Sequence, residues 1–172
     1  MNKIIILSDT HQNKDLLQRV LEQNQDSKYL IHLGDEPDDL EYFPELISEM
    51  YIYSVFGIYH QAWRQENSVL DFFIQINDNY ALNFHIAHVK EHHTIVDSKE
   101  KGINLYCFGH THHRYFEQVY DSTYFLNPGH LKKFFDRGEK AGYAIIEHNE
   151  VLNQIELFFK DYQSNIIERY IL

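Results

Sequence analysis

The sequence has few of the residues that mark secreted chains or chains that bind long nucleic acids. It contains one cysteine, Cys107, so no internal disulfide can form and nothing indicates an oxidising compartment. Basic residues are outnumbered, and the net charge of −11 disfavours non-specific binding to long nucleic acid. A small phosphorylated substrate is still compatible with this charge, because bound metal cations would dominate the local field.

The sequence also lacks long apolar runs and any segment that would divide the chain into domains. The first apolar run reaches Ser8 and Asp9 too early for a signal peptide or a membrane span. There is no internal repeat, low-complexity tract or linker, so we expect residues 1–172 to form one domain. We expect a cytoplasmic protein without a membrane partner, and the sequence leaves open whether it forms a homo-oligomer.

What the sequence does contain is typical of packed sheets. Hydrophobic residues make up 44% and aromatic residues 15% of the chain. The early half alternates strand and helix patterns, which predicts a βαβ unit with parallel strands, whereas the later half is rich in hairpins. Two packed sheets with helices outside them accommodate both halves.

The expected elements follow from apolar runs and turn signals. Helices are predicted after Asn13, which can cap the first, and from Pro37 to Met50 with an interruption at Pro44. A helix or loop is expected from Lys90 to Lys101, and a turn at residues 127–130. Strands are predicted at residues 3–7, 28–33, 51–56, 70–76, 80–87, 103–108, 115–119, 124–126, 143–147, 154–159 and 165–172.

Polar side chains follow five of these strands. The residues at these strand ends are Asp9 with His11, Asp35 after Gly34, the segment 57–60, His88, and His110 with His112. The strand ends of α/β proteins commonly carry the chemistry, and imidazoles with carboxylates are typical ligands of transition metals. If the backbone stays extended, His110 and His112 point the same way. The alternatives are a histidine-rich turn, helix-capping aspartates and a satisfied core histidine.

Taken in order, these motifs resemble those of calcineurin-like metallophosphoesterases. The matching elements are Asp9-x-His11, Gly34-Asp35, Gly57, His88 and Gly109-His110-x-His112. Asn127-Pro128-Gly129 is similar to a turn of the small single-domain YfcE-like phosphodiesterase branch. The resemblance runs from about residue 3 to about residue 129.

The resemblance implies a mixed α/β fold, a four-layer αββα sandwich of two packed sheets flanked by helices. It also implies two divalent transition-metal ions, with Mn expected first and Fe, Zn, Ni or Co as alternatives. One ion would be held by Asp9, His11, Asp35 and His112. The other would be held by Asp35, His88, His110 and an asparagine of the third motif. Such a pair of ions activates water for in-line attack on a phosphate ester.

The third motif departs from the family pattern. Where the family has Gly-Asn-Cys/His-Asp, this chain has Gly57-Ile58-Tyr59-His60, and Ile58 cannot bind a metal. We expect the second ion to be held more weakly, unless His60 or water fills the position. His60 and Tyr59 are the candidate catalytic groups.

Further differences touch the expected substrate side. Asn127, Gly129 and His130 are the candidate substrate-binding residues, although His130 stands where the family has serine.

Two functions follow from the resemblance. The first is a metal-dependent phosphodiesterase acting on a small phosphate ester. The second is a catalytically impaired scaffold, for which the small subunit of retromer is a precedent. The six ligands that the sequence keeps favour the enzyme.

Overall fold

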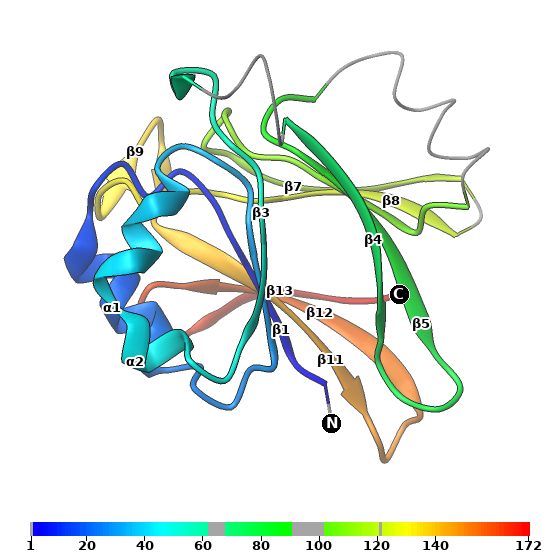
Figure 1. The fold of residues 1–172 in the computed structure, drawn as a ribbon. Helices are drawn as coiled ribbons and strands as arrows, with labels where there is room; N and C mark the ends of the chain where they lie inside the picture. The colour runs from blue at the N-terminus through cyan, green and yellow to red at the C-terminus, as the bar shows by residue number, and fades with distance from the viewer. Residues whose placement is uncertain (1, 62–67, 91–101, 121) are drawn as a thin grey trace.

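The computed structural model describes residues 2–61, 68–90, 102–120 and 122–172. Two large mixed sheets pack face to face, with helices outside one of them, so the predicted α/β sandwich is confirmed (Figure 1). Among the described residues the helices all pack on the six-stranded sheet, which accounts for three of the four expected layers. The helix or loop expected at residues 90–101 lies, from residue 91 on, outside the described residues.

The six-stranded sheet has the order β13-β12-β11-β1-β2-β3. β1 pairs in parallel with β2, as the βαβ pattern predicted, and β2 also pairs in parallel with β3. The other three strands run antiparallel to their neighbours. The strands are β1 (Ile4–Leu7), β2 (Tyr29–His32), β3 (Tyr51–Ser54), β11 (Gly142–Asn149), β12 (Gln154–Asp161) and β13 (Ile166–Ile171).

The five-stranded sheet has the order β4-β5-β6-β8-β7. Its three central strands are parallel, and the two outer strands are antiparallel to them. The strands are β4 (Val69–Gln75), β5 (Ala81–Ala87), β6 (Leu105–Cys107), β7 (Arg114–Tyr120) and β8 (Thr123–Pro128). The chain turns away after β5, β6 and β8 at the same end of the sheet, where His88, His110 and His130 stand.

The helices are shorter than the sequence predicted. α1 (Lys14–Glu22) begins as expected at Asn13, whose side chain accepts a hydrogen bond from the backbone N of Leu16. The helix predicted from Pro37 to Met50 is instead a 3₁₀-helix, η1 (Pro37–Tyr42), and a single turn, α2 (Pro44–Ile47). The interruption predicted at Pro44 is present, because proline disfavours helical geometry at the residue before it, and Phe43 has φ −129° and ψ 49°. None of the described helices is long and apolar enough to cross a membrane.

One small ribbon was not predicted. β9 (Phe135–Asp136) and β10 (Glu139–Lys140) form a hairpin around Arg137 and Gly138, both of which have positive φ. The turn predicted at residues 127–130 begins later than expected, since Asn127 and Pro128 belong to β8.

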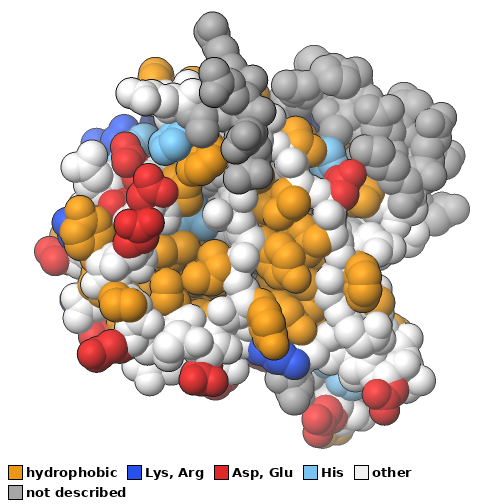
Figure 2. Space-filling view, in the orientation of Figure 1, with side chains coloured by type: hydrophobic (Ala, Val, Ile, Leu, Met, Phe, Trp, Pro, Cys, Tyr) orange, Lys and Arg blue, Asp and Glu red, His pale blue; other side chains and the backbone are white. Residues whose placement is uncertain are grey.

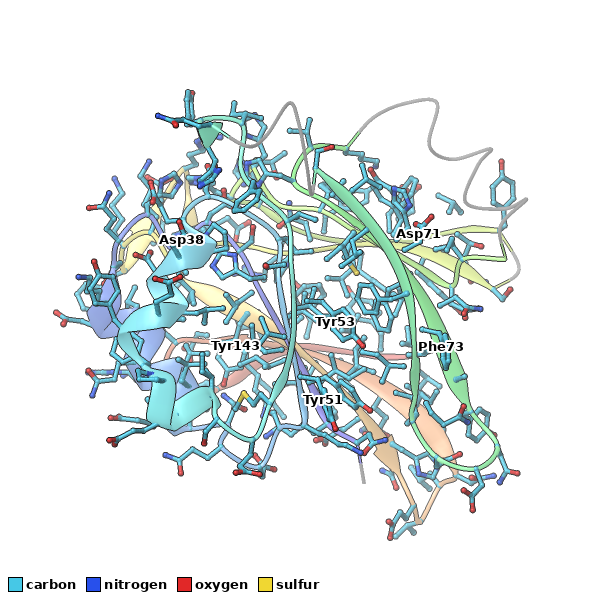
Figure 3. All side chains as sticks on the ribbon, in the orientation of Figure 1. Asp38, Tyr51, Tyr53, Asp71, Phe73 and Tyr143 are labelled. Atoms are coloured by element: carbon cyan, nitrogen blue, oxygen red, sulfur yellow. The ribbon has the colours of Figure 1, made fainter. Side chains whose placement is uncertain are left out.

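The core has two main layers. Ile4, Ile6 and Ile31 face the second sheet, whereas Ile5, Leu7 and Leu30 face the helices. Alternate residues of a strand face opposite sides of the sheet, and both sides are buried here. The sequences of these strands are therefore continuous apolar runs. At one edge of the sandwich, Tyr53 of β3, labelled in Figure 3, stacks on Phe72 of β4 with 3.8 Å between ring centroids.

Candidate metal centre

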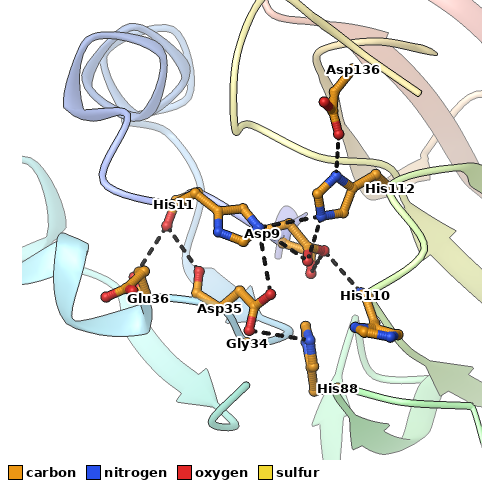
Figure 4. A network of polar contacts seen from close by, with 12 residues as sticks. Asp9, His11, Gly34, Asp35, Glu36, His88, His110, His112 and Asp136 are labelled. Atoms are coloured by element: carbon orange, nitrogen blue, oxygen red, sulfur yellow. Dashed lines mark hydrogen bonds and ion pairs between the residues drawn. The ribbon is translucent and has the colours of Figure 1, made fainter. Parts of the chain in front are cut away.

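The six predicted ligands lie together at the carboxyl ends of β1, β2, β5 and β6 (Figure 4). They form two groups, in each of which the ligand atoms lie within 4.8 Å of one another. The first group is Asp9, His11, Asp35 and His112, and the second is Asp35, His88 and His110. Asp35 belongs to both groups, so it can bridge two ions.

The loops that carry these ligands turn through left-handed backbone. Positive φ angles occur at five of the six ligands, namely Asp9, His11, Asp35, His110 and His112. Such angles are uncommon outside glycine, cost roughly 1–3 kcal/mol each and gather at functional sites. His110 and His112 therefore do not converge through an extended backbone as the sequence predicted. The turn instead sends His112 to the first group and His110 to the second.

Two glycines make room for the ligands. A Cβ on Gly57 would lie 1.8 Å from Oδ1 of Asp35 and 2.6 Å from its backbone N. Gly34 has a φ of +98°, and a Cβ there would lie 2.6 Å from Nδ1 of His88. Both positions bring backbone against a ligand at distances that any side chain would prevent.

The first group is tightly packed. Nε2 of His112 lies 3.2 Å from Oδ1 of Asp9 and 3.2 Å from Nε2 of His11. Nε2 of His11 lies 3.4 Å from Oδ2 of Asp35. The other oxygen of Asp9 accepts hydrogen bonds from the Ser8 hydroxyl and the backbone N of His110. Asp9 Oδ1 is thus left facing the group.

The second group has three ligands among the described residues. Nε2 of His88 lies 3.3 Å from Oδ1 of Asp35, and its Nδ1 donates a hydrogen bond to the Leu33 carbonyl. The ring of His110 lies 5.2 Å from that of His88. Ile58 stands where the family would supply a fourth ligand and offers none.

Asp136 supports the first group and was not predicted. Its Oδ2 accepts a hydrogen bond from Nδ1 of His112 over 2.6 Å, which leaves Nε2 of that ring for the ligand group. A carboxylate in this position fixes the ring and raises its basicity toward a metal. The Arg137-Gly138 turn could have indicated the hairpin, but no spacing links Asp136 to His112.

The electrostatics of the groups favour a cation. Burial acts to raise the pKa of Asp35, yet the contacts with His88, His11 and His110 together lower it below its usual range. Burial acts to lower the pKa values of His88 and His112, but their carboxylate partners raise both above the usual range.

The residues fit divalent transition-metal ions. Asp9 Oδ1 is fully buried and receives no well-oriented hydrogen bond within the described part of the chain. Mixed imidazole and carboxylate donors suit Mn, Fe, Co, Ni or Zn better than Mg or Ca. An ion among the first group would satisfy the oxygen that the protein leaves without a donor.

A buried hydrogen-bond network around His32 supports the loops that carry the ligands. Its Nδ1 accepts a hydrogen bond from the backbone N of Gly34, so its Nε2 donates toward the hydroxyl of Thr10, 3.4 Å away. That hydroxyl lies 2.7 Å from Oδ2 of Asp39, which also accepts from the backbone N of Gln12. The network fixes the β1 loop against η1.

We expect the free energy of unfolding to depend on pH because of the buried His32. Complete burial lowers the pKa of His32 from 6.5 to about 3, so the folded state keeps the ring neutral. Its stabilising contribution is full above pH 6.5 and is lost as the pH falls from 6.5 toward 3, by about 1.4 kcal/mol per unit. Urea unfolding of the metal-free protein at pH values between 7 and 4 gives the free energy of unfolding at each pH. This free energy should fall less steeply with decreasing pH in His32→Gln than in the wild type. Equal slopes would contradict this role.

The predicted substrate-binding residues lie behind the ligands. Asn127 is fully buried; its Nδ2 donates to the Gly109 carbonyl, and its Oδ1 accepts from the backbone N of Gly129. His130 is also fully buried, with its ring 5.4 Å from that of His112. Asn127 thus supports the loop that carries His110, and the contact of Asn127, Gly129 and His130 with a substrate stays a prediction.

The predicted catalytic residues lie on the other side, beside a cavity. Tyr59 and His60 line a hollow of about 330 Å³ that His11 and Asp35 also line. The ring of His60 stacks on Phe56, and its Nε2 lies 3.6 Å from Oδ2 of Asp38. Neither residue joins the two ligand groups.

Several solved structures share this fold. A conserved protein from Streptococcus pneumoniae, described as a predicted phosphoesterase, has a TM-score of 0.71 at 16% identity, covering 99% of this chain and 98% of its own. Zinc-bound Vps29 from Entamoeba histolytica has a TM-score of 0.67 at 15% identity, covering 98% of each chain. An archaeal phosphodiesterase has a TM-score of 0.63 at 20% identity, covering 99% of each.

Sequence comparison gives the family. No curated protein matches the chain. The sequence model of the calcineurin-like phosphoesterase superfamily domain, however, matches residues 2–150, which include all six ligands of the two groups. This chain belongs to the calcineurin-like phosphoesterase superfamily.

Proposed function

We propose that the protein is a metal-dependent phosphodiesterase that hydrolyses a small phosphate ester. The observation that carries the proposal is the pair of ligand groups sharing Asp35. Two divalent ions held there, Mn²⁺ foremost, would supply Lewis-acid activation of both the phosphoryl group and the attacking water. We place this activity in the cytoplasm, where the single, fully buried thiol of Cys107 would stay reduced.

The protein's own residues supply position and charge. Asp35 is held between His11 and His88, so it fixes the spacing of the two groups. Asp136 orients His112, and the Leu33 carbonyl orients His88. His60 and Tyr59 stand at the cavity where an ester group would leave, and we assign them the stabilisation of the charge that develops there.

The test is hydrolysis of bis(p-nitrophenyl) phosphate by metal-stripped protein before and after addition of Mn²⁺. We expect turnover only with the metal and little turnover with Asp9→Asn. Asp78→Asn is the matched control. Asp78 is exposed in the turn between β4 and β5, at the end of the hairpin that lies away from the ligand His88. No turnover with any of the divalent ions Mn, Fe, Co, Ni and Zn would favour a scaffold instead.

The scaffold function has one specific observation behind it. Ile58 leaves the second group with three ligands, and a chain without catalysis has no need of the fourth. The same fold also occurs in Vps29, which shows that it is not confined to proteins named as phosphodiesterases. We favour the enzyme because both groups keep their other ligands in place.

The two groups should retain metal unequally. The first has four ligands and the second three, so the first should keep its ion through purification and the second should be substoichiometric. Elemental analysis followed by calorimetric titration with Mn²⁺ tests this expectation. Two equally tight sites would show that another group, such as His60, completes the second.

Ile58→Asn should strengthen the second group. The amide oxygen is a suitable ligand, and asparagine is smaller than the half-buried isoleucine, so overpacking is not expected. We expect higher Mn²⁺ affinity and faster turnover, with metal-free stability lower by about 1–2 kcal/mol through lost apolar contact. Ile58→Val is the control and should change neither affinity nor rate. A lower rate in Ile58→Asn would mean that residues 57–60 have been rebuilt for another role.

A further inference from the structure

The β9–β10 hairpin and the residues just before it contact two of the loops that carry ligands. The backbone N of Leu131, which leads into the hairpin, donates to the carbonyl of Asp9 over 3.3 Å. Within the hairpin, Nη1 of Arg137 donates to the carbonyls of Thr111 and His110 over 3.2 and 3.4 Å. This segment is therefore held in a fixed position beside the metal centre.

The segment carries three cations, Lys132, Lys133 and Arg137. Nζ of Lys133 lies 2.9 Å from Oδ1 of Asp136, so its charge is balanced. Nε of Arg137 lies 4.0 Å from Oδ2 of the same carboxylate, and Lys132 forms no ion pair within the described part of the chain. Figure 2 shows Lys or Arg side chains beside a histidine at the upper left, where Figure 1 places β9. Lys132 and Arg137 are thus the cations that an anion can approach.

Both of these charges act on candidate ligands. Burial is the main cause that lowers the pKa of His11, and the charge of Lys132 adds to the lowering. Burial is also the main cause that lowers the pKa of His110, and the charge of Arg137 acts in the same direction. The two cations therefore lie beside ligands of different groups.

Positive charges in this position repel the metal ions for which the ligands are suited. An anion between the cations and the centre would remove that repulsion. The scissile phosphodiester carries one negative charge, which the metal centre itself would neutralise. Lys132 and Arg137 then match the charge of a phosphomonoester, which is about −1.5 to −2 at pH 7. The segment therefore favours a substrate with a second phosphate.

The position of the hairpin indicates which ester group carries that phosphate. In Figure 4, Asp136 of the hairpin and Glu36 lie on opposite sides of the ligands. Glu36 lines the cavity to which we assign the leaving group. The basic segment is therefore on the side of the ester group that stays on phosphorus.

We propose that Lys132 and Arg137 bind a second phosphate of the substrate, which is then a phosphodiester whose retained alcohol also carries a phosphomonoester. This inference rests on the proposed function and names its substrate class. In the reaction, the water oxygen binds phosphorus, the P–O bond to the leaving group breaks, and the proton that water loses goes to the leaving oxygen. The second phosphate is unchanged, so the products are a bisphosphate and an alcohol.

Two esters that differ only in the second phosphate test the proposal. They are the p-nitrophenyl ester of thymidine 5′-monophosphate and the same ester with a 3′-phosphate. With Mn²⁺ present, we expect kcat/KM to be about tenfold or more higher for the 3′-phosphorylated ester, because charge-assisted hydrogen bonds to phosphate are strong polar contacts. The preference should shrink with added salt, since salt screens exposed charges.

Variants locate the effect. Lys132→Gln should lower the ratio of the two kcat/KM values by about fivefold, and Lys132→Arg should keep most of the preference. The double variant with Lys132→Gln and Arg137→Gln should remove it. Both esters use the same metal centre, so the ratio isolates the second phosphate from any change in the centre. Lys28→Gln is the matched control with the ratio of the wild type, since Lys28 is exposed before β2, at the end opposite to Asp35.

The outcomes separate the two proposals. Equal kcat/KM for the two esters, or a preference for the ester without the 3′-phosphate, would overturn the second-phosphate site and leave the phosphodiesterase standing. A preference that survives in the double variant would do the same. Absence of turnover with both esters would overturn the phosphodiesterase.

Calorimetry in the presence of Mn²⁺ then tests the second-phosphate site by itself. It compares thymidine 3′,5′-bisphosphate with thymidine 5′-monophosphate on the wild type and the double variant. A preference for the bisphosphate that the double variant loses would support the inference. Equal affinities on the wild type, or a preference that the double variant keeps, would overturn it.

Discussion

Replacing Asp35 with asparagine should lower phosphodiesterase activity by about three orders of magnitude, or roughly 4 kcal/mol of transition-state stabilisation. Asp35 is the one residue in both ligand groups, and its two oxygens face different histidines. Asparagine keeps the shape but loses the charge and one of the two ligand oxygens. Metal content and kcat/KM should fall together.

Asp78→Asn is the control for this variant, because it makes the same chemical change at an exposed hairpin. It should match the wild type in metal content and rate. Circular dichroism should show that Asp35→Asn still folds, because the metal-free fold rests on the apolar layers between the sheets. A rate within tenfold of the wild type would mean that Asp35 does not bridge the ions.

Adding one methyl group at Gly57 should have a comparable effect on activity. The new Cβ would lie 1.8 Å from Oδ1 of Asp35 and 2.6 Å from its backbone N, so the carboxylate must leave its place. We expect Gly57→Ala to lose the second ion and most activity, and to be destabilised by about 1–3 kcal/mol. Metal analysis and urea unfolding measure the two effects separately.

Gly142→Ala distinguishes a local effect from general destabilisation. A Cβ there would lie 2.6 Å from the Lys160 carbonyl, within β11 and β12 and away from the ligands. This variant should lose stability yet keep its metal content and its rate per folded molecule. Equal metal loss in both variants would show that the effect of Gly57→Ala is not specific to Asp35.

The sequence was sufficient for the strands that carry the ligands. Ile4–Leu7 and Tyr29–His32 are buried on both faces, so their apolar runs end where the polar loops begin. Because parallel strands present their carboxyl ends at one edge, Asp9 and Asp35 could be expected to meet. His88 and His110 follow parallel strands of the second sheet in the same way.

What the sequence could not show depends on backbone conformation and distant contacts. The resemblance assigned His112 and His110 to different groups, and the structure places them so. The positive φ of both residues, which turns their side chains apart, is not revealed by residue spacing. Asp136 reaches His112 only because a two-residue hairpin, β9–β10, places it there. The interruption at Pro44 was predicted and is present, but the 3₁₀ geometry of Pro37–Tyr42 and the end of α2 at Ile47 were not.

The most direct test of the two-metal account is a titration that follows bound metal and rate together. Mn²⁺ is added stepwise to metal-stripped protein, and ions per chain and hydrolysis of bis(p-nitrophenyl) phosphate are measured at each step. The account predicts that the first equivalent binds tightly with little activity and that the rate rises as the second, weaker equivalent binds. Full activity with one ion per chain, or two bound ions without activity, would contradict it.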